Sequence, residues 1–124
     1  MDYYELTIPG VPVPRERARV GYGRSMFYTP MATRQYAHKV QVCAMAAQIK
    51  LLQGHISMEV TFYLPDRKRR DFDNLSKAIT DPLNGLAWVD DSDIAWLPGG
   101  ITIHKAIDKA NPRVEMKWWK TDGD

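Results

Sequence analysis

The most regular pattern in the chain is an alternation of apolar and polar positions that begins after His55. Apolar residues occupy every second position from Ile56 to Leu64. Because successive side chains of a strand point to opposite faces, this period of two predicts a strand with one buried face. The strand leads directly into a highly charged segment, 65–77, so a rigid element would hold that segment in place.

Weaker alternation predicts further strands on both sides of this one. We expect strands at Tyr4–Ile8 and at Val114–Trp118. The alternating apolar residues of Ile94–Ile103 predict one strand with a bulge or break at Pro98-Gly99-Gly100. A tight hairpin is the alternative.

Two helices are predicted from spacings of three and four residues. Thr29-Pro30 is a typical helix start, with a capping hydroxyl followed by proline at the first helical position, and the helix should run from about Met31 to Gln53. A second helix should begin with Asp71 or Asp73 as its cap, with a kink or an early stop at Pro82. A strand, an arginine-rich hairpin, a helix, a strand, a helix and two strands, in that order, indicate an α+β fold.

Length and composition limit the possibilities. A chain of 124 residues with 44% hydrophobic content predicts a single domain over residues 1–124. The lone Cys43 fits a reducing compartment, and no apolar run approaches the roughly 20 residues of a membrane span. The acidic, polar N-terminus is unlike a signal peptide. We therefore expect a cytoplasmic protein without membrane contact.

The charged segment carries the candidate chemistry. Four consecutive cations, Arg67, Lys68, Arg69 and Arg70, run into Asp71 and Asp73. Two close carboxylates repel each other unless a cation lies between them, and Mg²⁺ is well suited to carboxylate oxygens. The four cations can hold a polyanion beside that metal. The plainer interpretation is that the aspartates cap a helix and that the basic run is a solvated loop.

A second acidic group follows at Asp90, Asp91 and Asp93, after an apolar turn. We expect the two acidic groups to meet, so that Asp71, Asp73 and either Asp90 or Asp91 hold a catalytic divalent ion against a phosphodiester. Lys77, four residues beyond Asp73, would supply a fixed positive charge. As a surface ion pair with Asp73 or Asp81, the same lysine would contribute little.

A third basic feature lies near the N-terminus. Arg15, Arg17 and Arg19 alternate before a glycine-rich turn that contains Arg24. On a two-stranded ribbon the first three share one face and can contact phosphates, with aromatic residues nearby to stack on bases. A solvated hairpin is the alternative.

The stretches Leu64–Ala78 and Leu83–Asp93 together resemble the RusA-type Holliday junction resolvases. The dense match covers about a quarter of the chain, and the arginine hairpin and the Thr29-Pro30 helix start extend it. Two positions depart from the pattern, because Pro82 falls where many relatives continue a helix and Pro98-Gly99-Gly100 interrupts a strand.

The resemblance implies a homodimer with a mixed sheet packed against two helices. It also implies Mg²⁺-dependent nicking, with Mn²⁺ as a substitute, of symmetry-related strands in four-way junction DNA. Metal-binding roles would pass to Asp71, Asp73 and Asp91, with Asp90 as the second choice, and the catalytic lysine would be Lys77. The rival hypotheses are a non-catalytic DNA-binding module and a metal-dependent nuclease for duplex DNA or RNA.

Overall fold

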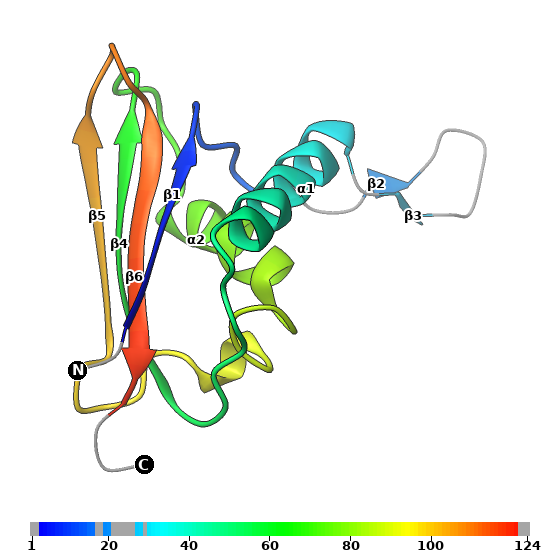
Figure 1. Cartoon of the computed structure of the whole chain (residues 1–124). Coiled ribbons are helices and arrows are strands. Elements are labelled where there is room, and N and C mark those ends of the chain that lie inside the picture. The colour runs from blue at the N-terminus through cyan, green and yellow to red at the C-terminus, as the bar shows by residue number, and fades with distance from the viewer. Residues whose placement is uncertain (1–2, 17–18, 21–26, 29, 122–124) are drawn as a thin grey trace.

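A four-stranded sheet with two helices on one face forms the body of the protein (Figure 1). The computed structural model describes residues 3–16, 19–20, 27–28 and 30–121. The elements, in chain order, are β1 (Tyr3–Pro9), β2 (Arg19–Val20), β3 (Phe27–Tyr28), α1 (Met31–Ala46), β4 (Ile56–Leu64), α2 (Phe72–Leu83), the short 3₁₀ helix η1 (Asp91–Asp93), β5 (Ile101–Ile107) and β6 (Arg113–Lys120).

The sheet is mixed, with strand order β1-β6-β4-β5. β6 pairs antiparallel with both β1 and β4, whereas β5 runs parallel to β4 and lies at the edge. A parallel neighbour requires a long crossover, and α2, η1 and the following loop supply it. The predicted α+β fold with a mixed sheet and two main helices is therefore confirmed.

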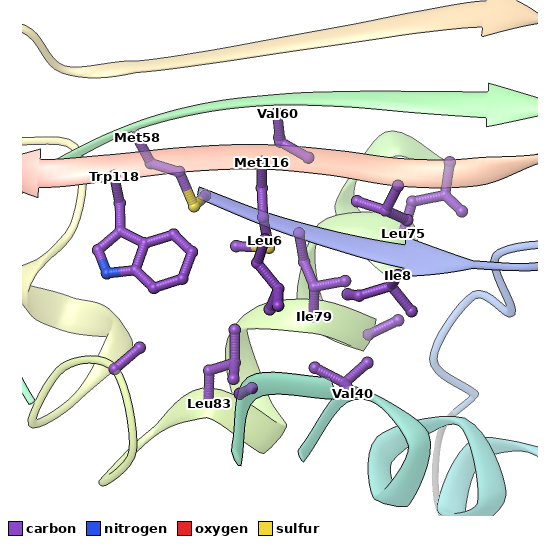
Figure 2. Close-up of a cluster of buried hydrophobic side chains, with 14 of the residues drawn as sticks. Leu6, Ile8, Val40, Met58, Val60, Leu75, Ile79, Leu83, Met116 and Trp118 are labelled. Atoms are coloured by element: carbon purple, nitrogen blue, oxygen red, sulfur yellow. The ribbon is translucent and has the colours of Figure 1, made fainter. Parts of the chain in front are cut away.

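The core lies between the sheet and the two helices (Figure 2). Apolar side chains from β1, β4 and β6 point toward α1 and α2, as the alternation in the sequence requires. The residues labelled in Figure 2 are Leu6, Ile8, Val40, Met58, Val60, Leu75, Ile79, Leu83, Met116 and Trp118. Burial of each large side chain contributes about 1.5–3 kcal/mol before the entropic cost of ordering it.

The first helix is shorter than predicted. α1 ends at Ala46, and Gln48 takes a positive φ of 58°, so the backbone leaves the helix well before Gly54. Three positions of the apolar stripe, Tyr36, Val40 and Ala44, are buried, but Leu51 is exposed. Beyond the helix the chain forms a loop in which Leu52 makes an isolated bridge to Trp88. Pro30 occupies the cap position without a side-chain hydrogen bond, and Thr29 lies outside the described residues.

The second helix starts and ends close to the prediction. Asp71 is the N-cap residue of α2, Asn84 is the C-cap residue, and Gly85 follows with a φ of 82°. Pro82 lies in the last turn, where the missing N–H removes one helical hydrogen bond, and the helix stops one residue later.

The segment Ile94–Ile103 is not one strand, so that prediction is wrong. Ile94 makes an isolated bridge to Ile56, and β5 begins only at Ile101. The loop between them is held against β4 by Ser57, whose hydroxyl donates to the carbonyl oxygen of Pro98 at 3.1 Å. No helix of the described residues is long and apolar enough to cross a membrane.

Candidate functional site

The charged segment connects the C-terminal end of β4 to the N-terminus of α2. Asp71 caps α2 through its backbone, since its carbonyl oxygen accepts the N–H of Leu75 at 3.0 Å, while its side chain makes no capping hydrogen bond. Asp73 lies in the first helical turn, and both side chains are exposed. Negative charge is favourable at this end of a helix, where backbone N–H groups are unpaired. A core strand and a core helix thus fix the position of the acidic pair.

Of the four consecutive cations, one is bound within the loop and three are exposed to solvent. Asp66 accepts hydrogen bonds from the Lys68 backbone N–H and from Arg70 Nη1, both at 2.9 Å. Arg70 Nη1 also donates to the Lys68 carbonyl oxygen at 3.1 Å, and the Arg70 side chain is only 11% exposed. The Lys68 N–H, followed by Arg70, holds the pKa of Asp66 below its usual value. Arg70 therefore stabilises the loop, whereas Arg67, Lys68 and Arg69 are exposed.

Lys105 also holds the charged segment in place, although the sequence did not lead us to predict this role. Its Nζ donates a hydrogen bond to the Arg70 carbonyl oxygen at 2.5 Å, which ties β5 to the residue before Asp71. A usable signal was present, because Lys105 replaces an apolar residue in the row Ile101, Ile103, Lys105, Ile107. A cation in an otherwise apolar row indicates a specific partner.

Lys77 lies beside the acidic pair. Its Nζ is 3.7 Å from Asp73 Oδ2, one helical turn earlier. Both side chains are about half exposed or more, so this ion pair adds little stability. It does place a positive charge next to one of the predicted ligands.

The second acidic group forms η1. Asp90 Oδ2 accepts the backbone N–H of Ser92 at 3.1 Å, and hydrogen bonds from the Ser92 side chain and backbone lower the pKa of Asp90. The pKa of Asp91 is raised, first by burial and then by the negative charges of Asp90 and Asp81, while Lys77 acts in the opposite direction. Asp91 therefore faces the middle and second half of α2 and shares Lys77 as a neighbour with Asp73.

One chain does not assemble the predicted ligand set as a single cluster. Asp71 stands at the N-terminus of α2, and Asp81, a neighbour of Asp91, lies about 15 Å further along the helix axis. Within the described residues no group of three or more His, Cys, Asp or Glu side chains is arranged to hold a metal ion. Asp71, Asp73 and Asp91 as joint ligands thus stay a prediction.

Arg15 has a partner that the hairpin hypothesis did not foresee. Its Nε is 3.0 Å from Asp81 Oδ2, and its backbone N–H donates to the Asn74 carbonyl oxygen at 2.9 Å. This segment thus runs along α2. β2 and β3 form the expected two-stranded ribbon, but Arg17 and Arg24 lie outside the described residues, as does the side chain of Arg19.

Comparison with known proteins identifies the family. The family described as Endodeoxyribonuclease RusA matches residues 9–117, which include both acidic groups, the four cations of residues 67–70 (the basic loop) and Lys77. The chain belongs to the RusA endodeoxyribonuclease family. It is 30% identical over 98 residues to the crossover junction endodeoxyribonuclease RusA of Escherichia coli strain K12, covering 76% of this chain and 78% of that protein. The phage 82 enzyme of the same name gives the same identity and coverage. The Aquifex aeolicus RusA is 28% identical over 82 residues, or 65% of each chain.

The donor chemistry of this RusA-family chain suits a hard divalent cation. Asp71 and Asp73 present exposed carboxylates, and no hydrogen bond or ion pair engages the Asp71 side chain within the described residues. The pKa of Asp91 is raised first by burial and then by the negative charges of Asp90 and Asp81, and a bound cation would offset those charges. These groups fit a cation by charge and by ligand type.

Proposed function

We propose that this chain is a Mg²⁺-dependent nuclease that resolves four-way DNA junctions by nicking two symmetry-related strands. One observation carries the proposal. The pair Asp71 and Asp73 stands on a rigid strand-to-helix junction, between exposed cations on one side and Lys77 on the other. This is the arrangement that phosphodiester hydrolysis requires, with acidic ligands and positive charge at one place. The name of these relatives, crossover junction endodeoxyribonuclease, supports the choice of substrate.

Each group has a distinct role in this proposal. Asp71, Asp73 and Asp91 would hold Mg²⁺, or Mn²⁺ in its place. When bound, the ion polarises a phosphoryl oxygen and makes water more acidic. Lys77 Nζ, already beside Asp73, stabilises negative charge that develops on the phosphate.

The exposed cations of the basic loop position the substrate. Arg67, Lys68 and Arg69 neutralise backbone phosphates and bring the scissile strand to the acidic pair. Arg70 acts from within the loop by keeping its shape, since Asp66 binds its guanidinium.

A four-way junction offers two equivalent strands, which favours two active sites in one particle. A homodimer with two-fold symmetry is the simplest assembly that provides them. Because the described part of one chain holds no group of three or more His, Cys, Asp or Glu side chains arranged for a metal ion, association of two chains is also a route by which acidic groups of different protomers would approach each other.

The test compares a synthetic four-way junction with a linear duplex of the same sequence, each with Mg²⁺ and with EDTA. The proposal predicts paired nicks at symmetric positions of the junction, only with Mg²⁺, and far slower nicking of the duplex. Equal cleavage of duplex and junction would indicate a nuclease of another substrate class. Tight junction binding without nicks at any metal concentration would indicate a DNA-binding module.

A further inference from the structure

The edge strand β5 has an apolar face that the helices leave open. The β4–β5 register places Ile101, Ile103 and Ile107 beside Met58, Val60 and Leu64, on the same face of the sheet. The three β4 residues are buried, yet Ile101 and Ile107 are 39% and 41% exposed. The helical layer thus covers β4 but stops short of β5, which lies at the outer edge of the sheet (Figure 1).

Two hollows lie along β5. One, of about 600 Å³, is lined by Phe72 and by residues of β5, namely Ile101, Ile103, His104 and Lys105. The other, of about 260 Å³, lies between the basic loop and the end of β5 and is lined by Leu64, Asp66, Arg67, Lys68, Arg69, Arg70, Lys105, Ala106 and Ile107. Lys105 lines both hollows, and we name the two together the β5 groove.

Phe72 forms the wall of the β5 groove that is nearest to the acidic pair. It is the first residue of α2, lies in sequence between Asp71 and Asp73, and is 61% exposed. More than half of its surface is therefore open to contact with a ligand.

The charge of the β5 groove is strongly positive. Arg67, Lys68, Arg69 and Lys105 line it, and the single carboxylate of its lining, Asp66, already binds Arg70. Cations above an apolar floor match a nucleic-acid strand, which presents phosphates on one side and flat bases on the other. A duplex with stacked bases could use the cations but not Phe72.

We propose that the β5 groove binds a single DNA strand, with Phe72 stacked on an unpaired base next to the phosphodiester at Asp71 and Asp73. This inference rests on the proposed nuclease function and adds the form of the substrate. Strands that exchange at a branch point have bases that are readily unstacked, so Phe72 would favour branched DNA over linear duplex. Lys105, on the same face as Ile101 and Ile103, continues the path of the strand along β5.

The experiment uses a four-way junction with 5-iodouracil at the branch point, bound to the full chain with Ca²⁺ in place of Mg²⁺ to suppress cleavage. After near-ultraviolet irradiation, mass spectrometry should find the crosslink on Phe72 or on a neighbouring groove residue. Phe72→Ala should weaken junction binding about tenfold and Phe72→Trp should retain it, consistent with the free energy of base–aromatic stacking. Met45→Ala, which changes an exposed apolar residue on α1, is the matched control and should bind normally.

The outcomes separate this inference from the proposed function. Crosslinks confined to other surfaces, or unchanged junction binding by Phe72→Ala, would show that the β5 groove does not bind the DNA strand. Neither result would affect the nuclease proposal. Failure of the unmodified chain to bind a junction overturns both. Conversion of a dimer to a monomer by Phe72→Ala in light scattering would assign the groove to a second copy of the chain and overturn its role in binding DNA.

Discussion

Lys105 Nζ donates a hydrogen bond to the carbonyl oxygen of Arg70, which joins the edge strand β5 to the residue immediately before Asp71. The two residues are 35 positions apart, so this contact closes the basic loop against the sheet. A positioned backbone at Arg70 in turn limits where the Asp71 carboxylate can lie.

Lys105→Met should slow nicking at saturating protein by about tenfold, because displacement of a catalytic group by a fraction of an ångström is costly. Single-turnover nicking of a junction measures the rate without the binding step. Lys109→Met, which removes an exposed lysine from the β5–β6 turn, serves as the control. Equal single-turnover rates for Lys105→Met and the unmodified chain would remove Lys105 from this role.

Arg69→Met and Arg70→Met should have different effects on the salt dependence of junction binding. Arg69 is exposed and free to neutralise a phosphate, so its loss should reduce the slope of log K against log salt by about one. Arg70 is bound by Asp66, so its loss should change the slope less and lower the thermal midpoint more. Identical slopes and midpoints for the two variants would contradict the different roles of Arg69, which contacts phosphate, and Arg70, which stabilises the loop.

Asp91→Asn should stabilise the metal-free protein at neutral pH. The pKa of Asp91 in the folded chain lies above the ordinary value of 3.8, so the folded state binds this proton more tightly than the unfolded state. Stability from this group is therefore present at low pH and is lost as pH rises through the raised pKa. The ionised side chain opposes folding at pH 7, and asparagine removes that cost.

Thermal unfolding in EDTA at several pH values tests this prediction. The variant should melt at a higher temperature than the unmodified chain at pH 7, and the difference should shrink below about pH 4. Aspartates with lowered pKa values, such as Asp66 and Asp108, affect both proteins equally and cancel in the comparison. A lower midpoint for Asp91→Asn at pH 7 would mean that its charge is compensated in the folded chain.

Ser57→Ala should destabilise the protein by about 1–3 kcal/mol, the cost of leaving buried polar groups without partners. The Ser57 hydroxyl lies 2.8 Å from Thr121 Oγ1 and donates to the Pro98 carbonyl oxygen. Urea unfolding measures the change, with Ser92→Ala in the exposed η1 helix as the control. Similar urea midpoints for all three proteins would show that this network contributes nothing to stability.

The bounds of an element could be predicted from the sequence where its pattern of apolar positions matches the residues that are buried. β4 was predicted to the residue, because all its apolar positions contact the core. α1 was predicted too long, since apolar spacing continues through Leu51 although tertiary contacts of Leu52 with Trp88 take over after the helix ends. The break before β5 was visible as Pro98-Gly99-Gly100, but alternation alone could not show that Ile94 leaves the strand.

For the candidate site, the sequence indicated which residues come together as charged groups, but not which side chains pair with one another. Asp71, Asp73 and Lys77 were found from charge and spacing, and Lys77 does lie beside Asp73. Sequence could not show that Arg70 turns inward to Asp66 or that Arg15 binds Asp81, because these pairings depend on loop geometry. The apolar row of β5 marked Lys105 as unusual, but its partner could not be predicted because that partner is a backbone carbonyl, which has no signature in the sequence.

The most direct test of the nuclease proposal measures nicking and binding of a four-way junction by Asp71→Asn in Mg²⁺. The substitution keeps the size of the side chain and removes one carboxylate. The proposal predicts that nicking falls to the level of the protein-free control, while junction affinity stays equal or increases. Undiminished Mg²⁺-dependent nicking by Asp71→Asn would contradict it.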